Sequence, residues 1–163
     1  MTLKIVPLQE SHFIGLREVL DVVAREKRYF SLTQAPPLEE CCERYRGILL
    51  NDQCLFVAEL DGEVAGWCDI LPVRGDTRIH VGLLGIGMYA SARQRGIGQQ
   101  LMRATIDKAW QKGLTRIELT VRTDNLNAIA LYKRAGFQPE GVHRRANQIE
   151  GEYFDTVSMA LLR

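Results

Sequence analysis

A short glycine-rich turn in the middle of the chain carries the residues whose spacing points most directly to chemistry. It reads Arg93-Gln94-Arg95-Gly96-Ile97-Gly98-Gln99 and follows an apolar run from Leu83 to Tyr89. A helical pattern leads out of the turn from Ile97 to Trp110. A strand that feeds such a turn at the start of a helix presents unpaired backbone N–H groups at a positive dipole end. The stretch therefore predicts an anion site, most often one for a phosphate.

The strand before the turn has two different faces. Gly85, Gly87 and Tyr89 share one face, and Ile86 and Met88 lie on the other, because side chains alternate along a strand. Two glycines on one face leave a shallow trough in which an extended ligand could approach the backbone. A bulge or close packing of a helix explains them equally well, so both interpretations stay open.

The stretch from Arg116 to Arg122 also alternates, with Glu118, Thr120 and Arg122 on its polar face. A strand between two helices is normally covered on both faces and apolar throughout. The polar face of this strand therefore meets solvent or lines a cleft.

A helix from Asn125 to Ala135 follows this strand. Its Asn125, Ile129 and Tyr132 have spacings of four and three and therefore share one helix face. Physical chemistry alone favours a helix cap for Asn125 and a partly buried packing residue for Tyr132.

These segments need a scaffold of strands and helices. The pattern predicts a first strand at 3–8, helices at 13–23 and 38–50, and a loop between the helices at 30–37. An Asp61-Gly62 pair between two apolar runs predicts a hairpin of 55–60 and 64–70, which continues into a third antiparallel strand. A closing hairpin of 141–146 and 153–161 ends the chain. The order is that of an α/β (α+β) fold, expected as a single domain over residues 1–163.

The totals exclude several classes of protein. The chain has 163 residues, 46% of them apolar and 25% charged, and a formal net charge of +1. Such a charge gives no reason to expect nucleic acid as a partner. No apolar run approaches the ~20 residues that span a membrane, and the start lacks a secretion signal. The four cysteines, without histidines at zinc spacing, predict reduced thiols, no metal and a cytoplasmic protein.

Two of these motifs together resemble those of a known family. The turn Arg93–Gly98 is similar to the acetyl-coenzyme A signature of the GNAT N-acetyltransferase superfamily, Q/R-x-x-G-x-G/A. Asn125–Phe137 is similar to its second signature, N-x-x-A-x-x-L-Y-x-x-x-G-F. The resemblance extends from about Leu55 to the C-terminus. The tail around Gly151-Glu152-Tyr153-Phe154-Asp155 resembles the branch that acetylates free amino acids and related small amines.

The resemblance implies a fold and a set of roles. It implies a mixed, mostly antiparallel sheet of about six to seven strands, with about four helices and a central parallel pair that splays apart. The pantetheine arm of coenzyme A would lie in that gap and pair with the backbone of Ile86 and Met88, with the Met88 N–H as the candidate that polarises the thioester carbonyl. Asn125 would bind pantetheine, and Tyr132 would protonate the departing thiolate. The pyrophosphate would be held by the turn residues Arg93, Gln94, Arg95, Gly96, Ile97, Gly98 and Gln99.

The general base is the open point. An acceptor amine is mostly protonated at neutral pH, so a group must remove a proton. Better-known family members place a glutamate on the strand before the glycine turn, but Val81–Tyr89 contains no carboxylate. Glu118 is the preferred candidate, although an ordinary surface role fits it as well. His80 and Asp69 are the remaining candidates for the base, and Glu152 and Asp155 could instead hold the substrate ammonium group.

Two classes of function follow from the resemblance. The first is an enzyme that moves acetyl directly from acetyl-coenzyme A to a primary amine in a ternary complex. Its acceptor would be an L-amino acid or similar small amine, or alternatively a protein or peptide N-terminus. The second is a non-catalytic acyl-coenzyme A sensor, which would not need Tyr132 as an acid. Family members commonly form homodimers, so a homodimer is left open.

Overall fold

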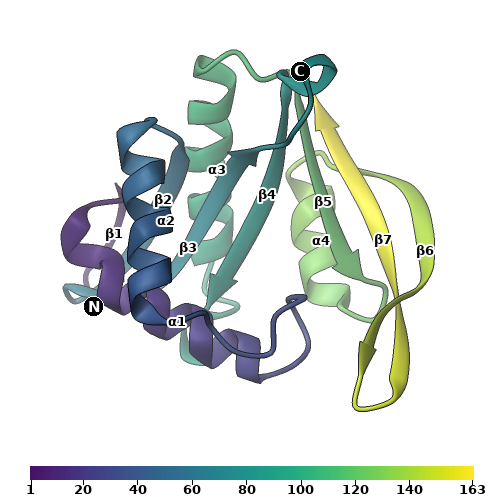
Figure 1. The fold of residues 1–163 in the computed structure, drawn as a ribbon, viewed down its shortest axis with the longest axis horizontal. Helices are drawn as coiled ribbons and strands as arrows, with labels where there is room; N and C mark the ends of the chain where they lie inside the picture. The colour runs from purple at the N-terminus through teal and green to yellow at the C-terminus, as the bar shows by residue number, and fades with distance from the viewer.

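The computed structural model describes all 163 residues and contains seven strands and four helices around one sheet (Figure 1). In chain order the elements are β1 (Leu3–Pro7), α1 (Phe13–Arg25), α2 (Leu38–Leu50), β2 (Cys54–Leu60), β3 (Glu63–Pro72), β4 (Val81–Met88), α3 (Ile97–Gln111), β5 (Arg116–Arg122), α4 (Leu126–Arg134), β6 (Gln138–Ile149) and β7 (Glu152–Leu162). The predicted fold class, with its parallel pair, is confirmed.

The strand order is β1-β2-β3-β4-β5-β7-β6. Every neighbouring pair is antiparallel except β4 with β5, which run parallel. The hairpin predicted at Asp61-Gly62 is the β2–β3 turn, and both residues have positive φ. The closing hairpin is longer than predicted, because β6 extends from Gln138 to Ile149 as an exposed edge strand whose polar sequence lacks the apolar alternation that marks a strand.

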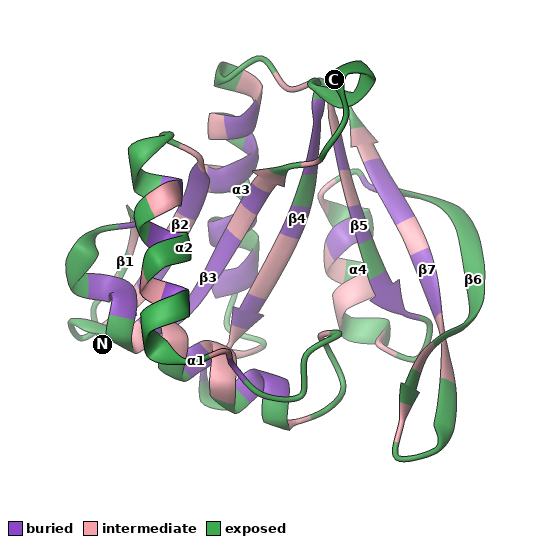
Figure 2. Ribbon diagram, in the orientation of Figure 1, coloured by how far each residue is buried: buried purple, intermediate pink, exposed green.

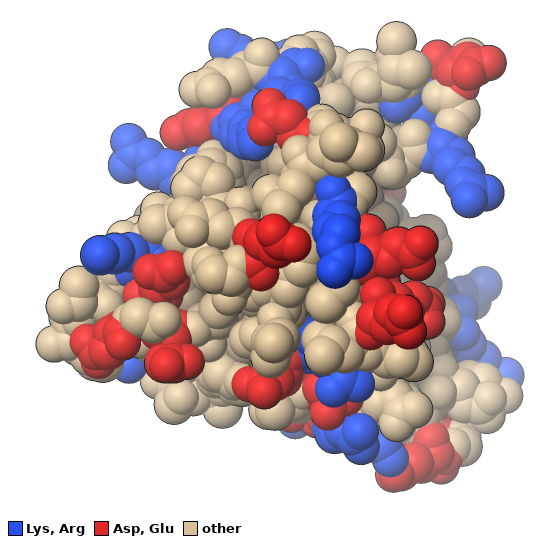
Figure 3. Space-filling view, turned by 60° about the vertical axis from the view of Figure 1, so that its left-hand side comes forward, with Lys and Arg blue, Asp and Glu red and all other residues tan.

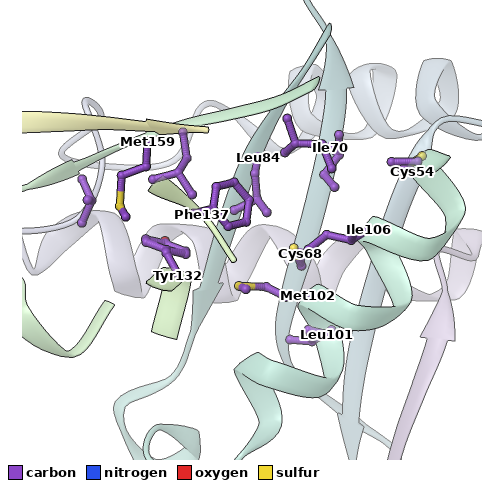
Figure 4. Close-up of a cluster of buried hydrophobic side chains, with 14 of the residues drawn as sticks. Cys54, Cys68, Ile70, Leu84, Leu101, Met102, Ile106, Tyr132, Phe137 and Met159 are labelled. Atoms are coloured by element: carbon purple, nitrogen blue, oxygen red, sulfur yellow. The ribbon is translucent and has the colours of Figure 1, made fainter. Parts of the chain in front are cut away.

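The sheet separates two hydrophobic clusters. On one face, α1 and α2 pack against β2 and β3 around residues such as Leu16, Tyr45 and Trp67. On the other face, α3 and α4 form the larger cluster with β3, β4, β5 and β7, in which Tyr132 lies beside Phe137 and Met159 (Figures 2 and 4). Alternation along β3 explains the division, since Trp67 belongs to one cluster and Cys68 to the other.

The parallel pair is short and then opens. β4 and β5 pair only at Val81–Leu83 with Arg116–Glu118, although β4 continues to Met88 and β5 to Arg122. Beyond Glu118, β5 stays paired with β7. The two strands therefore splay apart toward their carboxyl ends, where the glycine turn begins, and the gap narrows to an apex just beyond Leu83.

Two further findings concern the surface and the cysteines. None of the helices combines the length and the apolar composition that crossing a membrane requires. Acidic and basic side chains are interspersed on the face shown in Figure 3, and neither sign dominates it. All four cysteines are free, and Cys41, Cys54 and Cys68 are buried.

Candidate active site

A groove of about 470 Å³ occupies the gap between β4 and β5. Its walls come from β4, the glycine turn, β5, α4 and the end of α1. Nine of the eleven residues predicted to bind the cofactor line it: Ile86, Met88, Arg93, Gln94, Gly96, Gly98, Gln99, Asn125 and Tyr132. Two do not. Ile97 is buried in the core below the turn, and Arg95 is exposed, with its guanidinium on Ser91 O and Met1 Sδ.

Two backbone N–H groups of β4 point into the gap. The N–H of Tyr89 donates to Ala65 O of β3 at 3.0 Å. Because successive N–H groups along a strand point to opposite sides, those of Met88 and Ile86 point away from β3 and toward β5. β5 does not pair with this part of β4, so both donors are available to a ligand with an extended amide backbone. This geometry agrees with the role predicted for Ile86 and Met88.

The glycine turn has the geometry of an anion site. Gly96 precedes α3 in the left-handed region at φ 76°, and Gln94 also has a positive φ of 59°. The helix start leaves the N–H groups of Ile97, Gly98 and Gln99 without partners inside the helix. Gly98 has a different reason to be glycine, since a β-carbon there would lie 3.2 Å from Met88 Cε and 3.3 Å from Leu131 Cδ2. One glycine shapes the turn, and the other allows α3 to begin close to β4 and α4.

Arg93 makes contacts that its sequence motif did not reveal. Its guanidinium forms an ion pair with Glu26 at 2.5 Å, donates from Nε to Met88 O at 3.2 Å, and lies 4.8 Å from the centre of the Tyr29 ring. The hydrogen bond to Glu26 raises the pKa of Arg93 above its ordinary value. Arg93 therefore fastens the end of α1 to the glycine turn, and its predicted contact with pyrophosphate stays a prediction.

Three basic residues line the groove without having been predicted. They are Arg28 after α1, Arg122 at the end of β5 and Arg134 in α4. Arg122 is buried, pairs with Asp124 at 2.6 Å and lies 3.6 Å from the centre of the Phe154 ring. The alternation of its strand placed Arg122 on the polar face that meets solvent or lines a cleft. Isolated arginines are common on protein surfaces, so no pattern in the sequence marked Arg28 and Arg134.

Asn125 and Tyr132 reach the groove from opposite ends of α4. Asn125 is the N-cap and accepts a hydrogen bond from Ala128 N–H at 3.2 Å, which satisfies one orphan donor of the helix. Its side-chain amide still lines the groove. The capping role expected from physical chemistry is therefore present, and it leaves the amide N–H groups available to a ligand.

Tyr132 is 7% exposed and belongs to the core cluster, yet it also lines the groove. Every fully buried side-chain polar atom in the structure has a partner. The Tyr132 hydroxyl makes no protein hydrogen bond, so it is open to the groove. Burial raises the pKa of Tyr132 above its ordinary value. The phenol is therefore protonated at neutral pH and able to donate its proton.

Glu118 lies outside this groove. It is opposite Leu83 at the last paired position of β4 and β5, and two arginines hold its carboxylate, Arg78 at 2.8 Å and Arg116 at 2.8 Å. These bonds, the one from Arg116 first, lower the pKa of Glu118. A carboxylate stabilised in its charged form is a weak proton acceptor. The role of Glu118 as the base is still a prediction, and the two arginines beside its carboxylate make it a poor proton acceptor.

The other candidates for the base or for holding the ammonium group differ in their surroundings. His80 and Glu152 are exposed, and Asp155 accepts a hydrogen bond from Arg145 N–H at 2.8 Å within the β6–β7 hairpin. Asp69 in β3 is partly buried and accepts a hydrogen bond from Trp67 Nε1 at 3.0 Å. Burial raises its pKa to about 6, although the Trp67 bond acts in the other direction.

The glycine face of β4 is filled by its neighbours. A β-carbon at Gly87 would lie 2.6 Å from Trp67 Cη2 and 2.9 Å from Phe30 Cζ, and one at Gly85 would lie 3.1 Å from Asp69 Oδ1. The glycines therefore allow close packing, as one of the two interpretations had it, but the packing is not that of a helix. The packing partners are side chains of β3 and of the loop after α1.

The splayed strands, the glycine turn and the Tyr132 hydroxyl at the groove are the arrangement of an acyltransferase scaffold, and comparison with known proteins agrees. The model of the acetyltransferase (GNAT) family matches residues 17–137, so the chain belongs to this family. The match begins well before Leu55, where the motifs first indicated it. By its family and relatives, the chain is an N-acetyltransferase.

Three known proteins illustrate the similarity. L-amino acid N-acetyltransferase AaaT of Escherichia coli (strain K12) is 38% identical over 110 residues, which cover 66% of this chain and 67% of that protein. A ribosomal-protein-alanine N-acetyltransferase from Brucella melitensis superposes with a TM-score of 0.93 at 21% identity, covering 98% and 99% of the two chains. The acetyltransferase yncA from Salmonella typhimurium, solved with its cofactor acetyl-CoA, has a TM-score of 0.94 at 16% identity, covering 99% and 94%. The last two similarities show the fold alone.

Proposed function

We propose that the protein transfers an acetyl group from acetyl-coenzyme A to the primary amine of an L-amino acid or a similar small amine. The observation that carries the proposal is the groove, which joins the N–H groups of the glycine turn to those of Ile86 and Met88 and to the hydroxyl of Tyr132. This arrangement fits an extended pantetheine arm with an anionic pyrophosphate at one end. The similarity to AaaT supports an amino acid as the acceptor, and the acetyl-CoA in yncA supports the donor.

Each side of the groove has a separate task. The turn from Gln94 to Gln99 holds the pyrophosphate, and Asn125 binds the pantetheine. The N–H of Met88 polarises the thioester carbonyl, because a donor aimed at developing negative charge stabilises the tetrahedral intermediate. Tyr132 donates its proton to the thiolate as the carbon–sulfur bond breaks. No covalent acyl-enzyme is needed, so donor and acceptor bind together.

A screen of acceptors tests this proposal. Release of coenzyme A is followed with twenty L-amino acids, polyamines and short peptides as acceptors, and the products are checked by mass spectrometry. We expect steady turnover with at least one free amino acid and an N-acetylated product. Turnover only with peptides would move the assignment to protein N-termini, the alternative for which the Brucella melitensis neighbour provides a fold-level precedent. Binding of acetyl-coenzyme A with no turnover on any amine would assign the chain to the sensor class.

A homodimer and a cytoplasmic location are part of the same proposal. Both are common for enzymes with this donor, and light scattering of the purified protein measures the first directly. A monomer at working concentration would remove the dimer from the proposal without affecting the transfer reaction.

A further inference from the structure

One side of the β4–β5 pair is open at the apex of the gap. α1 and α2 cover β2 and β3, but the same side of β4 and β5 is left without a helix (Figure 1). Leu83 is 47% exposed there, Thr120 is exposed and Gly85 is half-buried. We call this open surface, formed by Leu83, Gly85, Glu118 and Thr120, the acceptor face. It adjoins the narrow end of the groove, which is where an arm entering from the glycine turn would end.

Asp69 projects over this face from the neighbouring strand. It is the partner of Gly85 in the β3–β4 register, and Gly85 lies two residues beyond the last β4 residue paired with β5. A β-carbon at Gly85 would lie 3.1 Å from Asp69 Oδ1. The carboxylate of β3 therefore occupies the space that a side chain of β4 would fill. β4 contains no carboxylate, but the carboxylate of Asp69 in β3 lies beside β4 at the apex of the gap.

A second cavity lies behind this carboxylate. It has a volume of about 180 Å³ and is enclosed by α1, α2 and β3, with Asp69 and Trp67 among its lining residues. The exposed side chains of Glu40 and Arg44 lie in its lining. Such a volume holds several waters, each of which needs about 30 Å³. Asp69 therefore faces the acceptor face on one side and a path to solvent on the other.

The surroundings of Asp69 suit a proton acceptor. Burial raises its pKa to about 6, and the hydrogen bond from Trp67 and the charge of Arg44 limit the rise. The other titratable groups that line the cavity are Glu40, Cys41 and Tyr45 of α2, since α1 and β2 contribute only leucines to it. Asp69 is thus charged at neutral pH, and its basicity is closer to the operating pH than that of Glu118. Proton transfer is most efficient when the two are matched.

We propose that Asp69 binds the amino group of the acceptor above Gly85 and accepts its proton. This inference rests on the proposed transfer of acetyl to an amine. The ammonium of the acceptor loses two protons in the reaction. Asp69 takes the first, which frees the nitrogen lone pair to attack the thioester carbon, and then releases that proton to water in the cavity behind it.

The second proton leaves when the carbon–sulfur bond breaks. Tyr132 donates its proton to the sulfur, and the proton lost from nitrogen restores the phenol through water in the groove. The products are the acetylated amine, the free thiol and one proton delivered to solvent. Asp69 and Tyr132 thus act on opposite sides of the reacting carbon, one on the amine and one on the thiolate.

The test is Asp69→Asn with Asp107→Asn as the matched control, because Asp107 is exposed on α3 and lines neither cavity. Asparagine has nearly the same shape and still accepts the Trp67 hydrogen bond, so we expect the fold and the affinity for coenzyme A to be retained. With each L-amino acid accepted by the wild type, we expect Asp69→Asn to lower kcat/KM by about 100-fold or more. The acid limb of the wild-type pH profile, near pH 6, should disappear in the variant. Asp107→Asn should keep that limb and the rate.

A second nucleophile separates proton transfer from folding. Hydroxylamine is largely neutral at neutral pH and does not need a base before it attacks a thioester. We expect Asp69→Asn to keep most of its wild-type rate with hydroxylamine while it loses the rate with amino acids. Equal losses with both nucleophiles, or lost affinity for coenzyme A, would assign Asp69 a structural role and overturn the inference. Unchanged kcat/KM with the limb in place would overturn it too, whereas a wild type that acetylates no amine would refute the proposed function itself.

Discussion

The groove between β4 and β5 and the acceptor face are adjacent, but they are built in different ways. The groove takes most of its predicted residues from two short segments, Arg93–Gln99 and Asn125–Tyr132. Its main donors are backbone N–H groups. The acceptor face takes its residues from two strands, β4 and β5, and Asp69 of a third strand, β3, lies opposite Gly85 beside it.

The difference teaches where each kind of specificity is encoded. Backbone donors depend on turn geometry, which glycines impose locally and which short motifs can record. Side chains gathered from several strands depend on register, which no short motif contains. The groove can therefore be predicted from a sequence more readily than the acceptor face can.

The largest expected effect concerns Tyr132, whose hydroxyl is the proposed proton donor in the groove. Tyr132→Phe removes the proton donor for the thiolate but keeps the ring that packs against Phe137. We expect kcat to fall by about 100-fold or more, the usual range for an acid catalyst, with coenzyme A affinity within about threefold. Steady-state kinetics and calorimetry measure the two quantities, and Tyr153→Phe on the exposed hairpin is the control. Unchanged turnover would remove the acid role and leave the groove as a binding site only.

A second change tests whether the glycine face of β4 is packed. Gly87→Ala places a β-carbon 2.6 Å from Trp67 and 2.9 Å from Phe30. We expect the free energy of unfolding to fall by about 1–3 kcal/mol, as overpacking does, in thermal or denaturant unfolding. Gly141→Ala is the matched control, because nothing lies within 4 Å of its β-carbon. If both variants were equally stable, the glycines would serve ligand approach rather than packing.

The third prediction concerns the stability cost of keeping Asp69 charged. Burial raises its pKa from the ordinary 3.8 to about 6, so the folded state favours the protonated form. Asp69 therefore stabilises the fold most below pH 4 and loses this contribution as the pH rises toward 6. We expect Asp69→Asn to be more stable than the wild type at neutral pH by about 1–2 kcal/mol.

The advantage of Asp69→Asn should shrink as the pH falls toward 4, which unfolding curves at several pH values would show. An asparagine variant that is less stable than the wild type at neutral pH would mean that the charge contributes to the fold. That outcome would weaken the contrast between a functional acceptor face and a structural core.

The smallest effect is expected at the junction between α1 and the glycine turn. Glu26→Gln removes the charge that pairs with Arg93 at 2.5 Å. Partly exposed ion pairs contribute about 1 kcal/mol or less, so stability should change little. Coenzyme A affinity should rise slightly, by about twofold, if the released guanidinium reaches the pyrophosphate. Affinity is measured by calorimetry, with Arg25→Gln as the control. A marked loss of affinity would show that the Arg93–Glu26 ion pair maintains the shape of the glycine turn.

Much of the fold could be predicted because many of its elements have short sequence signals. Asp61-Gly62 marks a hairpin, and Gly96 with Gly98 marks a helix start beside a ligand site. The same holds for Asn125 and Tyr132, whose motif places both on one helix. The prediction of β6 was too short, because an exposed edge strand needs no apolar alternation. Arg28 and Arg134 of the groove could not be predicted, because a single arginine belongs to no pattern, whereas the alternation of β5 placed Arg122 on a polar face.

By itself, the sequence determined the family, the strand–turn–helix with the geometry of an anion site, and the helix that carries Asn125 and Tyr132. These features depend on backbone geometry within a few residues, so the residue types at neighbouring sequence positions are enough to predict them. Only the tertiary structure decided that the glycine face is packed, that Arg93 is held by Glu26, and that Asp69 lies over Gly85. Each of these depends on which residues of distant segments become neighbours, and that is set by strand register and helix packing rather than by spacing along the chain.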